Sequence, residues 1–470
     1  MKRTALIFAL AASFGMSALL LWLVPALRHG PAPVAAPEPP AVPTPPTPPV
    51  TPLLNTGGPL TLRATLSDPF LHAGGLREVF LKIDLDAEKA AGSERAPVNL
   101  ALVLDRSGSM AGDKIEHARR AARHLVAQLN ERDRFALVTF GSEVTTLVES
   151  VQATPEAKQR LMAAIDGISE IGGTNISGGV EAGLAAIIAY KSRYAVSRLV
   201  LLSDGQANEG IVSPEGLSAL SRKVNAQGVI LSAIGVGLDF NEHVMESMAD
   251  YGGGAYHFLS DSEQLAAIFD RELQQATRTV ASSPVLTIRP KGGTLQEVYG
   301  YLSEQDGGVM RVRLPDFAAG EHRKVVVRML VPASSVGALA VADVSVDYAD
   351  VTRDRAPATA ALSVGATVTP DFQLAAQNRN KDVAAVAAHA EAVKGMREAG
   401  KQYAQGRRSE AEAAIRQARK KLEAAKSTLG SYEEFEQAEG EARAFEDAVQ
   451  SYAAPSAAAK RIHSYSNQAR

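Results

Sequence analysis

Residues 99–110 read NLALVLDRSGSM, and this stretch decides the fold of the chain. Its apolar run lacks the polar alternation of a half-solvated strand, so both faces are expected to be covered, as in the middle of a parallel sheet. Asp105 ends that strand, at the edge where open α/β sheets bind ligands. Asp105, Ser107 and Ser109 occupy alternate positions, and Gly108 permits a turn that aims their oxygens at one point. Hard oxygen donors with little negative charge suit Mg²⁺ better than a soft metal.

Two more oxygen-bearing side chains lie in comparable places further along the chain. Thr174 follows the glycine pair of Gly172-Gly173-Thr174-Asn175, just before an apolar helix, and Asp204 follows an apolar strand over 199–203. Together with Asp105-x-Ser107-x-Ser109, they resemble the motifs of von Willebrand factor type A domains, in which D-x-S-x-S begins the metal-ion-dependent adhesion site. The resemblance implies a bound divalent cation, Mg²⁺ or else Mn²⁺ or Ca²⁺. The ligands that it implies are Asp105, Ser107, Ser109, Thr174 and Asp204.

The hydroxyls of this set also have a simpler interpretation, as caps of turns and helices. That interpretation does not explain why two buried strands both end in aspartate. The resemblance instead implies that the serines bind the cation directly, and that the threonine and the aspartates exchange direct and water-mediated roles. A partner protein's Asp or Glu carboxylate would fill the remaining position. Residues next to the ligands would form a rim that sets specificity: Arg106, Asn175, Gln206 and Glu209.

Strand and helix patterns alternate over residues 97–278. This alternation predicts an α/β domain with a doubly wound, mostly parallel sheet and helices on both faces. The von Willebrand resemblance implies the same fold. Asp113 and Glu116 have the spacing of a capping box at the start of the helix that follows the first loop. Residues 144–148 are expected to form a short edge strand.

Residues 54–96 and 279–370 show strand patterns, and we expect them to form one β-sandwich into which the α/β domain is inserted. Residues 371–470 are helical in pattern, and Gly406 separates two apolar seams, so an αα-hairpin is expected there. This layout resembles that of bacterial von Willebrand type A proteins labelled calcium-activated chloride channel homologues. The label implies no pore here, because a single stretch of the sequence is long enough to span a membrane.

The N-terminal region is expected to anchor the chain in a membrane. Lys2 and Arg3 precede an uncharged stretch over residues 4–27, so residues 1–30 are predicted to be a single-pass transmembrane signal anchor. Residues 31–53 form a Pro-rich linker, for which we expect an extended polyproline conformation. With the positive residues kept inside, the folded part would lie in the periplasm, tethered to the inner membrane. The alternative is a cleaved signal peptide, after which the protein is secreted.

Composition and missing motifs exclude several other functions. The 470 residues carry a net charge of −3 and include no cysteine. This charge offers no basic surface for nucleic acid, and the lack of cysteine excludes disulfides, thiolate metal sites and cysteine nucleophiles. The sequence has no P-loop and no G-x-S-x-G elbow, and His243 and His257 match no zinc spacing. We therefore predict a membrane-tethered, metal-dependent protein-binding module that is not an enzyme.

Two alternatives to this function stay open. The first is an adaptor in the assembly of an envelope complex, with a partner from the AAA+ chaperones that often accompany such domains. The second is a metal-dependent hydrolase. It is disfavoured because, apart from Asp105 and Asp204, the motifs place no residue that could act as a general base.

Overall fold

The computed structural model describes most of the chain that follows residue 53. The described residues are 54–55, 58–89, 95–194, 196–204, 206–237, 242–259, 262–430, 432–433, 435–440 and 442–443. The predicted transmembrane segment (1–30) and Pro-rich linker (31–53) lie outside them. Among the helices of the described part, none is both long and apolar enough to cross a lipid bilayer.

Within the described residues, an α/β domain is built on a six-stranded sheet with the strand order β10-β9-β8-β5-β6-β7. Neighbouring strands run parallel, except that β7 pairs antiparallel with β6 at one edge. The strands are β5 (Val98–Asp105), β6 (Arg134–Phe140), β7 (Val144–Gln152), β8 (Val196–Ser203), β9 (Ile230–Val236) and β10 (Gly253–Leu259). The predicted α/β fold is confirmed, and the edge strand β7 continues four residues beyond the predicted end at residue 148.

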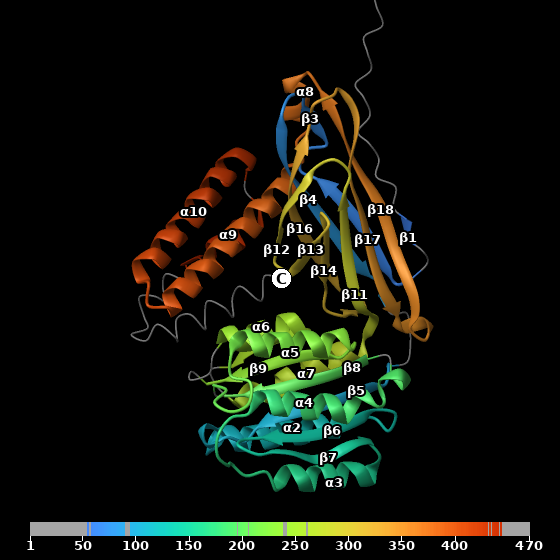
Figure 1. Ribbon diagram of the computed structural model, residues 1–470, viewed down its shortest axis with the longest axis vertical. Helices are drawn as coiled ribbons and strands as arrows, with labels where there is room; N and C mark the ends of the chain where they lie inside the picture. Colours follow the sequence, from blue (N-terminus) through green and yellow to red (C-terminus); the bar gives the residue numbers. More distant parts are fainter. Residues whose placement is uncertain are drawn as a thin grey trace, which may run out of the picture. The chain divides into compact units, whose positions relative to one another are not determined.

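Helices cover both faces of this sheet (Figure 1). They are α2 (Asp113–Gln128), α3 (Pro155–Asp166), α4 (Ile176–Ile188), α5 (Pro214–Ala226), α6 (Glu242–Gly252) and α7 (Leu265–Thr277). Helices α2, α3 and α7 share one hydrophobic cluster with alternate side chains of β5, and α4, α5 and α6 share a second cluster with the intervening side chains. Every residue of β5 is buried, as the apolar run over residues 100–104 predicts.

The start of helix α2 differs from the sequence prediction. A capping box would put Asp113 at the N-cap, but Gly112 occupies that position and Asp113 is already the first helical residue. The capping-box prediction was wrong because the helix begins one residue earlier than the pattern requires, so Asp113 is not the N-cap and Glu116 is not the third helical residue. Asp113 and Glu116 instead lie in the first turn, where negative charge is favoured by the helix dipole.

Helix α4 lies unusually close to the sheet, and its glycines permit this. A Cβ atom added to Gly183 would lie 2.5 Å from Val103 Cγ2 and 2.9 Å from Leu199 Cδ1. We expect Gly183→Ala to lower the free energy of unfolding by about 1–3 kcal/mol, because overpacking outweighs the gain of about 1 kcal/mol in helix propensity. Urea denaturation would measure the loss, with Gly167→Ala as the control because its added Cβ meets neighbours at 3.6 Å. A Gly183→Ala protein as stable as the wild type would contradict the close approach.

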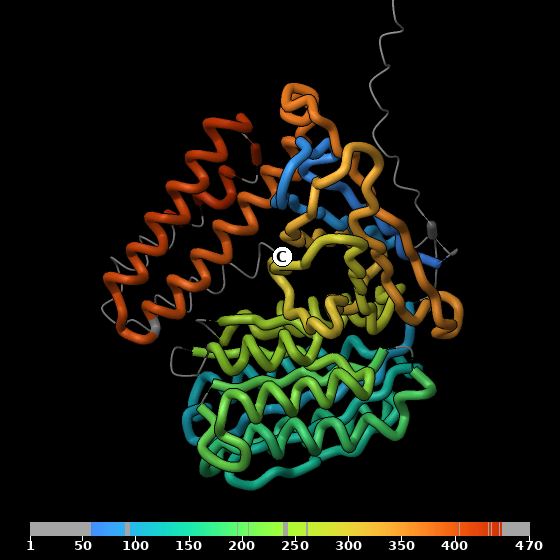
Figure 2. The backbone as a smooth tube through the Cα atoms, turned by 45° about the horizontal axis from the view of Figure 1, so that its top comes forward, coloured from blue at the N-terminus to red at the C-terminus, as the bar shows by residue number. Residues whose placement is uncertain are grey.

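The strands on either side of the α/β domain form two further sheets that enclose one hydrophobic cluster. Within the described residues, the larger sheet contains β1 (Leu54–Asn55), β3 (Phe70–His72), β11 (Thr279–Pro290), β13 (Ser303–Asp306), β14 (Val309–Arg313), β15 (Phe317–Ala318), β17 (Gly337–Asp350) and β18 (Ala356–Thr369). The smaller one contains β2 (Leu60–Leu66), β4 (Leu76–Ala87), β12 (Thr294–Tyr299) and β16 (His322–Pro332). Strand β4 precedes the α/β domain, yet its residues 76–86 pair with β16, which follows that domain (Figure 2).

The strands are followed by the helices α8 (Phe372–Gln377), α9 (Lys381–Ala404) and α10 (Arg408–Leu429). Met396 and Tyr403 of α9 share a hydrophobic cluster with Ile415 and Leu422 of α10, and Gly406 lies between the two helices. Helix α9 also contacts the smaller sheet, because Val386 and Ala387 pack with Tyr299 and Val326.

Candidate functional site

The two buried aspartates predicted from the sequence meet at the carboxyl ends of neighbouring strands. Strands β5 and β8 pair in parallel with Leu104 opposite Leu202, so Asp105 and Ser203 end their strands side by side. The Ser203 hydroxyl donates a hydrogen bond to Asp105 Oδ2 at 2.5 Å. Asp204 follows directly, and both aspartates have no exposed surface. The fold thus brings two buried carboxyl groups to one edge of the sheet.

The serine loop after β5 joins these carboxyl groups through hydrogen bonds. The backbone N–H of Ser107 donates to Asp105 Oδ1 at 2.8 Å. The hydroxyls of Ser107 and Ser109 are 3.0 Å apart, and the Ser109 hydroxyl donates to Asp204 Oδ1 at 2.7 Å. Four of the five predicted ligands are therefore connected in a single chain of contacts.

The loop that carries Thr174 lies against the serine loop. The Gly108 N–H donates to the Gly172 carbonyl at 3.1 Å, and the Ile171 N–H donates to the Arg106 carbonyl at 2.6 Å. On the other side, the Thr174 N–H donates to Asn208 Oδ1 at 2.7 Å, and the Asn208 N–H returns a bond to the Thr174 carbonyl at 3.1 Å. Thr174 is thus buried between the loop that follows β5 and the loop that follows β8.

The surroundings of Asp105 are unfavourable for a negative charge. The pKa of Asp105 is raised from 3.8 to about 6, mainly by burial and to a smaller extent by the nearby Asp204 carboxylate, while hydrogen bonds from Ser107 and Ser203 act in the opposite direction. Asp204 has a cationic neighbour, since Lys114 Nζ forms a salt bridge to its Oδ2. A buried carboxyl group with a raised pKa among polar groups is typical of a functional site.

These residues fit a divalent cation of the hard type. The set offers two carboxylates and three hydroxyls, and Mg²⁺ combines a few carboxylates with neutral oxygens and water in an octahedron. Across the described residues, no group of three or more His, Asp or Glu is placed to hold a metal. The hydroxyls are therefore essential to any cation site at this edge, and the shell would remain open to an oxygen from outside the chain.

The four predicted rim residues have different surroundings. The Asn175 Oδ1 accepts hydrogen bonds from the Gly178 N–H at 2.9 Å and from the Ser177 hydroxyl at 3.1 Å, so this side chain caps helix α4. Glu209 accepts a hydrogen bond from the Ser142 hydroxyl at 2.8 Å. Gln206 is exposed, whereas Arg106 and Glu209 are half-buried.

Four residues of this site were missed by the sequence analysis. Ser142, Ser203 and Asn208 hold the loops together through their side chains, and Lys114 contacts Asp204. Ser203 could have been suspected, because a polar residue ends an otherwise apolar strand directly before Asp204. The other three lie in loops or a helical turn whose approach to the site depends on tertiary structure.

A second buried charged group lies elsewhere in the α/β domain. Glu272 of α7 accepts a hydrogen bond from the Arg198 guanidinium at 2.8 Å, and His257 Nε2 lies 2.8 Å from its other oxygen. Burial alone would raise the pKa of Glu272, but Arg198 and His257 outweigh it and hold the pKa at about 2. His257, which matches no zinc spacing in the sequence, thus belongs to an internal ion-pair network.

Comparison with known proteins agrees with this architecture. Residues 99–271 match the family described as von Willebrand factor type A domain. The chain is 30% identical over 207 residues to the protein YfbK of Escherichia coli, covering 44% of this chain and 36% of that one. It is 24% identical over 303 residues to the Synechocystis protein sll0103, covering 62% and 71% of the two chains. Human inter-alpha-trypsin inhibitor heavy chain H3 is 31% identical over 198 residues, 41% of this chain and 22% of its own.

Two solved structures resemble the fold over most of the chain. A von Willebrand factor type A protein from Catenulispora acidiphila has a TM-score of 0.67 at 18% identity, covering 83% of this chain and 91% of its own. The ArnB paralog VWA2 from Sulfolobus acidocaldarius has a TM-score of 0.61 at 19% identity, covering 87% and 98%. The chain spans only about a third of the Escherichia coli relative, so the match concerns the shared domain. Residues 99–271 of this chain form a von Willebrand factor type A domain.

Proposed function

We propose that Asp105, Ser107, Ser109, Thr174 and Asp204 hold a divalent cation, with Mg²⁺ as the resident ion. The chain of contacts from Asp105 through the two serines to Asp204 carries this proposal. Two carboxyl groups without exposed surface need a positive partner, and the three hydroxyls supply the neutral oxygens that Mg²⁺ accepts. When bound, the cation would supply positive charge for a carboxylate from outside the chain.

The function that follows is metal-dependent binding of a protein partner rather than catalysis. A partner's Asp or Glu carboxylate would complete the octahedron, and Arg106, Gln206 and Glu209 would contact the residues around it. Contacts between ionised groups are stronger than neutral ones, so removing either the cation or the partner's carboxylate should weaken binding strongly. Residues 1–30 would anchor the module in the inner membrane, and residues 31–53 would hold its folded part in the periplasm.

A calorimetric titration of the full-length protein with Mg²⁺ tests the cation site. We expect one Mg²⁺ per chain, and we expect Thr174→Val, which keeps the shape but loses the hydroxyl, to weaken binding about 10-fold. Thr146→Val on the edge strand β7 is the matched control and should bind as the wild type does. Equal binding by the Thr174→Val protein would remove the threonine from the site, and no heat with the wild type would reject the site itself.

A capture experiment tests the partner. Immobilised protein would be incubated with detergent-solubilised membranes in Mg²⁺ or in EDTA. We expect to capture a partner that binds in Mg²⁺ and is released by EDTA. The Asp105→Asn protein should not bind this partner.

Protease accessibility in spheroplasts tests the location, because a periplasmic domain is digested without lysis while a cytoplasmic one is protected.

A further inference from the structure

Lys114 reaches into the candidate cation site from the first turn of helix α2. Its ammonium contacts Asp204 Oδ2 and lies 3.2 Å from the Ser109 carbonyl oxygen. A Cβ atom added to Gly237, just past the end of β9, would lie 3.3 Å from Lys114 Nζ. The ammonium therefore lies beside the ends of three neighbouring parallel strands, β5, β8 and β9.

We propose that Lys114 is the built-in counter-ion of Asp204 in the metal-free protein and competes with a metal ion for this carboxylate. This inference rests on the proposed function of the site and adds its regulation. Without a divalent cation, the ammonium neutralises a carboxylate that has no contact with solvent. When a divalent cation binds, the ammonium leaves Asp204.

The exposure of the two partners decides which of them moves. The Lys114 side chain is 27% exposed, whereas that of Asp204 is 0% exposed and is held by the Ser109 hydroxyl. A lysine stem is flexible, and its ammonium is readily hydrated, so it can move to solvent at little cost. Asp204 comes directly after β8 in the chain, so its carboxylate cannot move with the ammonium. A divalent cation and an ammonium on one carboxylate repel each other, so the ammonium gives way.

Competition of this kind has a measurable consequence. The lysine stabilises the metal-free protein and raises the concentration of cation at which the site fills. A lysine that merely positioned Asp204 for the metal would have the opposite effect, because its removal would weaken metal binding. The two roles are therefore distinguished by whether removal of the lysine charge strengthens or weakens metal binding.

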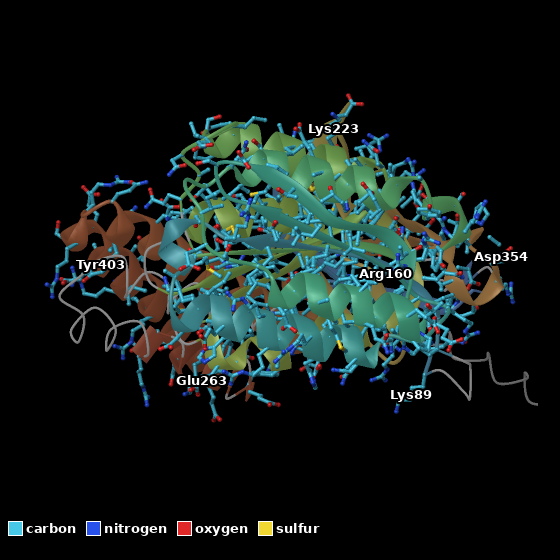
Figure 3. All side chains as sticks on the ribbon, turned by 90° about the horizontal axis from the view of Figure 1, so that it is seen from below. Lys89, Arg160, Lys223, Glu263, Asp354 and Tyr403 are labelled. Atoms are coloured by element: carbon cyan, nitrogen blue, oxygen red, sulfur yellow. The ribbon has the colours of Figure 1, made fainter. Side chains whose placement is uncertain are left out.

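The test compares wild-type protein with Lys114→Met, which keeps the length of the side chain and removes its charge. We expect the Kd for Mg²⁺, measured by calorimetry, to fall by about 10-fold or more, and the melting temperature in EDTA to fall by several degrees. Lys114→Arg keeps a positive charge and should bind Mg²⁺ no more tightly than the wild type. Lys223→Met on α5, an exposed residue that is labelled in Figure 3, is the control and should change neither quantity.

A double-variant cycle in EDTA makes the pairing testable without any metal. If Lys114 and Asp204 compensate each other, the melting temperature of Lys114→Met/Asp204→Asn exceeds the value expected from adding the two single losses. An unchanged or higher Kd for Mg²⁺ in Lys114→Met, with the wild type binding normally, overturns the competition and leaves the proposed function intact. If neither protein binds Mg²⁺ in any concentration, the proposed function and the competition both fall. Binding by Lys114→Met alone would support the competition and reject a filled site in the wild type.

Discussion

Replacing Asp105 by asparagine is expected to weaken Mg²⁺ binding by at least about 100-fold while making the metal-free protein more stable. A carboxylate that contacts the cation contributes more to metal affinity than the groups that only hydrogen-bond to the ligands. Loss of one of those groups alone lowers metal affinity by about 10–100-fold. Asparagine retains an oxygen that can accept from the Ser107 N–H and an amide that can face the Ser203 hydroxyl. The change therefore removes a charge and keeps the local hydrogen bonds.

The gain in stability follows from the pKa of Asp105. Burial raises this pKa from 3.8 to about 6, so the folded metal-free protein favours the protonated acid. The stabilising contribution of that proton is fully present below about pH 4 and is lost as the pH rises through about 6. At pH 7.5 the wild type bears the cost of an ionised buried acid, at most about 3 kcal/mol, and the asparagine variant does not. Above pH 6 we expect the variant to be more stable by about 1–3 kcal/mol.

Urea denaturation in EDTA and calorimetry with Mg²⁺ would measure both effects on the same two proteins. The stability difference should vanish near pH 4, and the Mg²⁺ affinity of the wild type should fall below pH 6, where the cation competes with a proton. Asp113→Asn, an exposed carboxylate in the first turn of α2, serves as the control. An Asp105→Asn protein that binds Mg²⁺ normally would show that this carboxyl group is not a ligand.

Residues whose roles follow from local pattern could be predicted from the sequence. The apolar run over 100–104 requires cover on both faces, and the alternation of strands and helices over 97–278 specifies the α/β fold. Parallel strands end at a common edge, so Asp105 and Asp204 could be placed together before any coordinates. Whether the five predicted ligands bind a cation stays a prediction.

Residues whose roles depend on tertiary contacts could not be predicted. Lys114 looks like an ordinary helical surface residue, and only the packing of α2 brings it to Asp204. Asn175 was assigned to the rim by its position in sequence, yet its carbonyl oxygen is used to cap α4. The boundary of α2 was misplaced by one residue, because a carboxylate in the first turn and one at the N-cap give similar patterns.

Breaking the ion pair inside the α/β domain should have the largest effect on stability. Glu272 is 1% exposed and Arg198 5%, so Glu272→Gln leaves a buried guanidinium without its carboxylate partner. Such a loss costs about 3–5 kcal/mol. Replacing both residues by apolar ones, Arg198→Met with Glu272→Leu, should recover at least half of the lost stability. The reason is that most of the loss comes from the buried unpaired charge and not from the missing hydrogen bond. Equal stability of Glu272→Gln and wild type at pH 7 would contradict the network.

Two measurements distinguish loss of the Glu272 ion pair from rearrangement of the whole domain: the pH dependence of stability and the affinity for Mg²⁺. Arg198 and His257 hold the pKa of Glu272 at about 2, against an ordinary value of 4.5, so its contribution is present above pH 4.5 and is lost as the pH falls toward 2. The stability difference between wild type and Glu272→Gln, from urea denaturation at several pH values, should therefore shrink between pH 5 and pH 3. Arg198 lies near the start of β8, six residues before Asp204, which follows the other end of that strand roughly 20 Å away. The folded variant should bind Mg²⁺ with wild-type affinity, and a loss of affinity equal to that of Asp105→Asn would instead mean that the whole domain has rearranged.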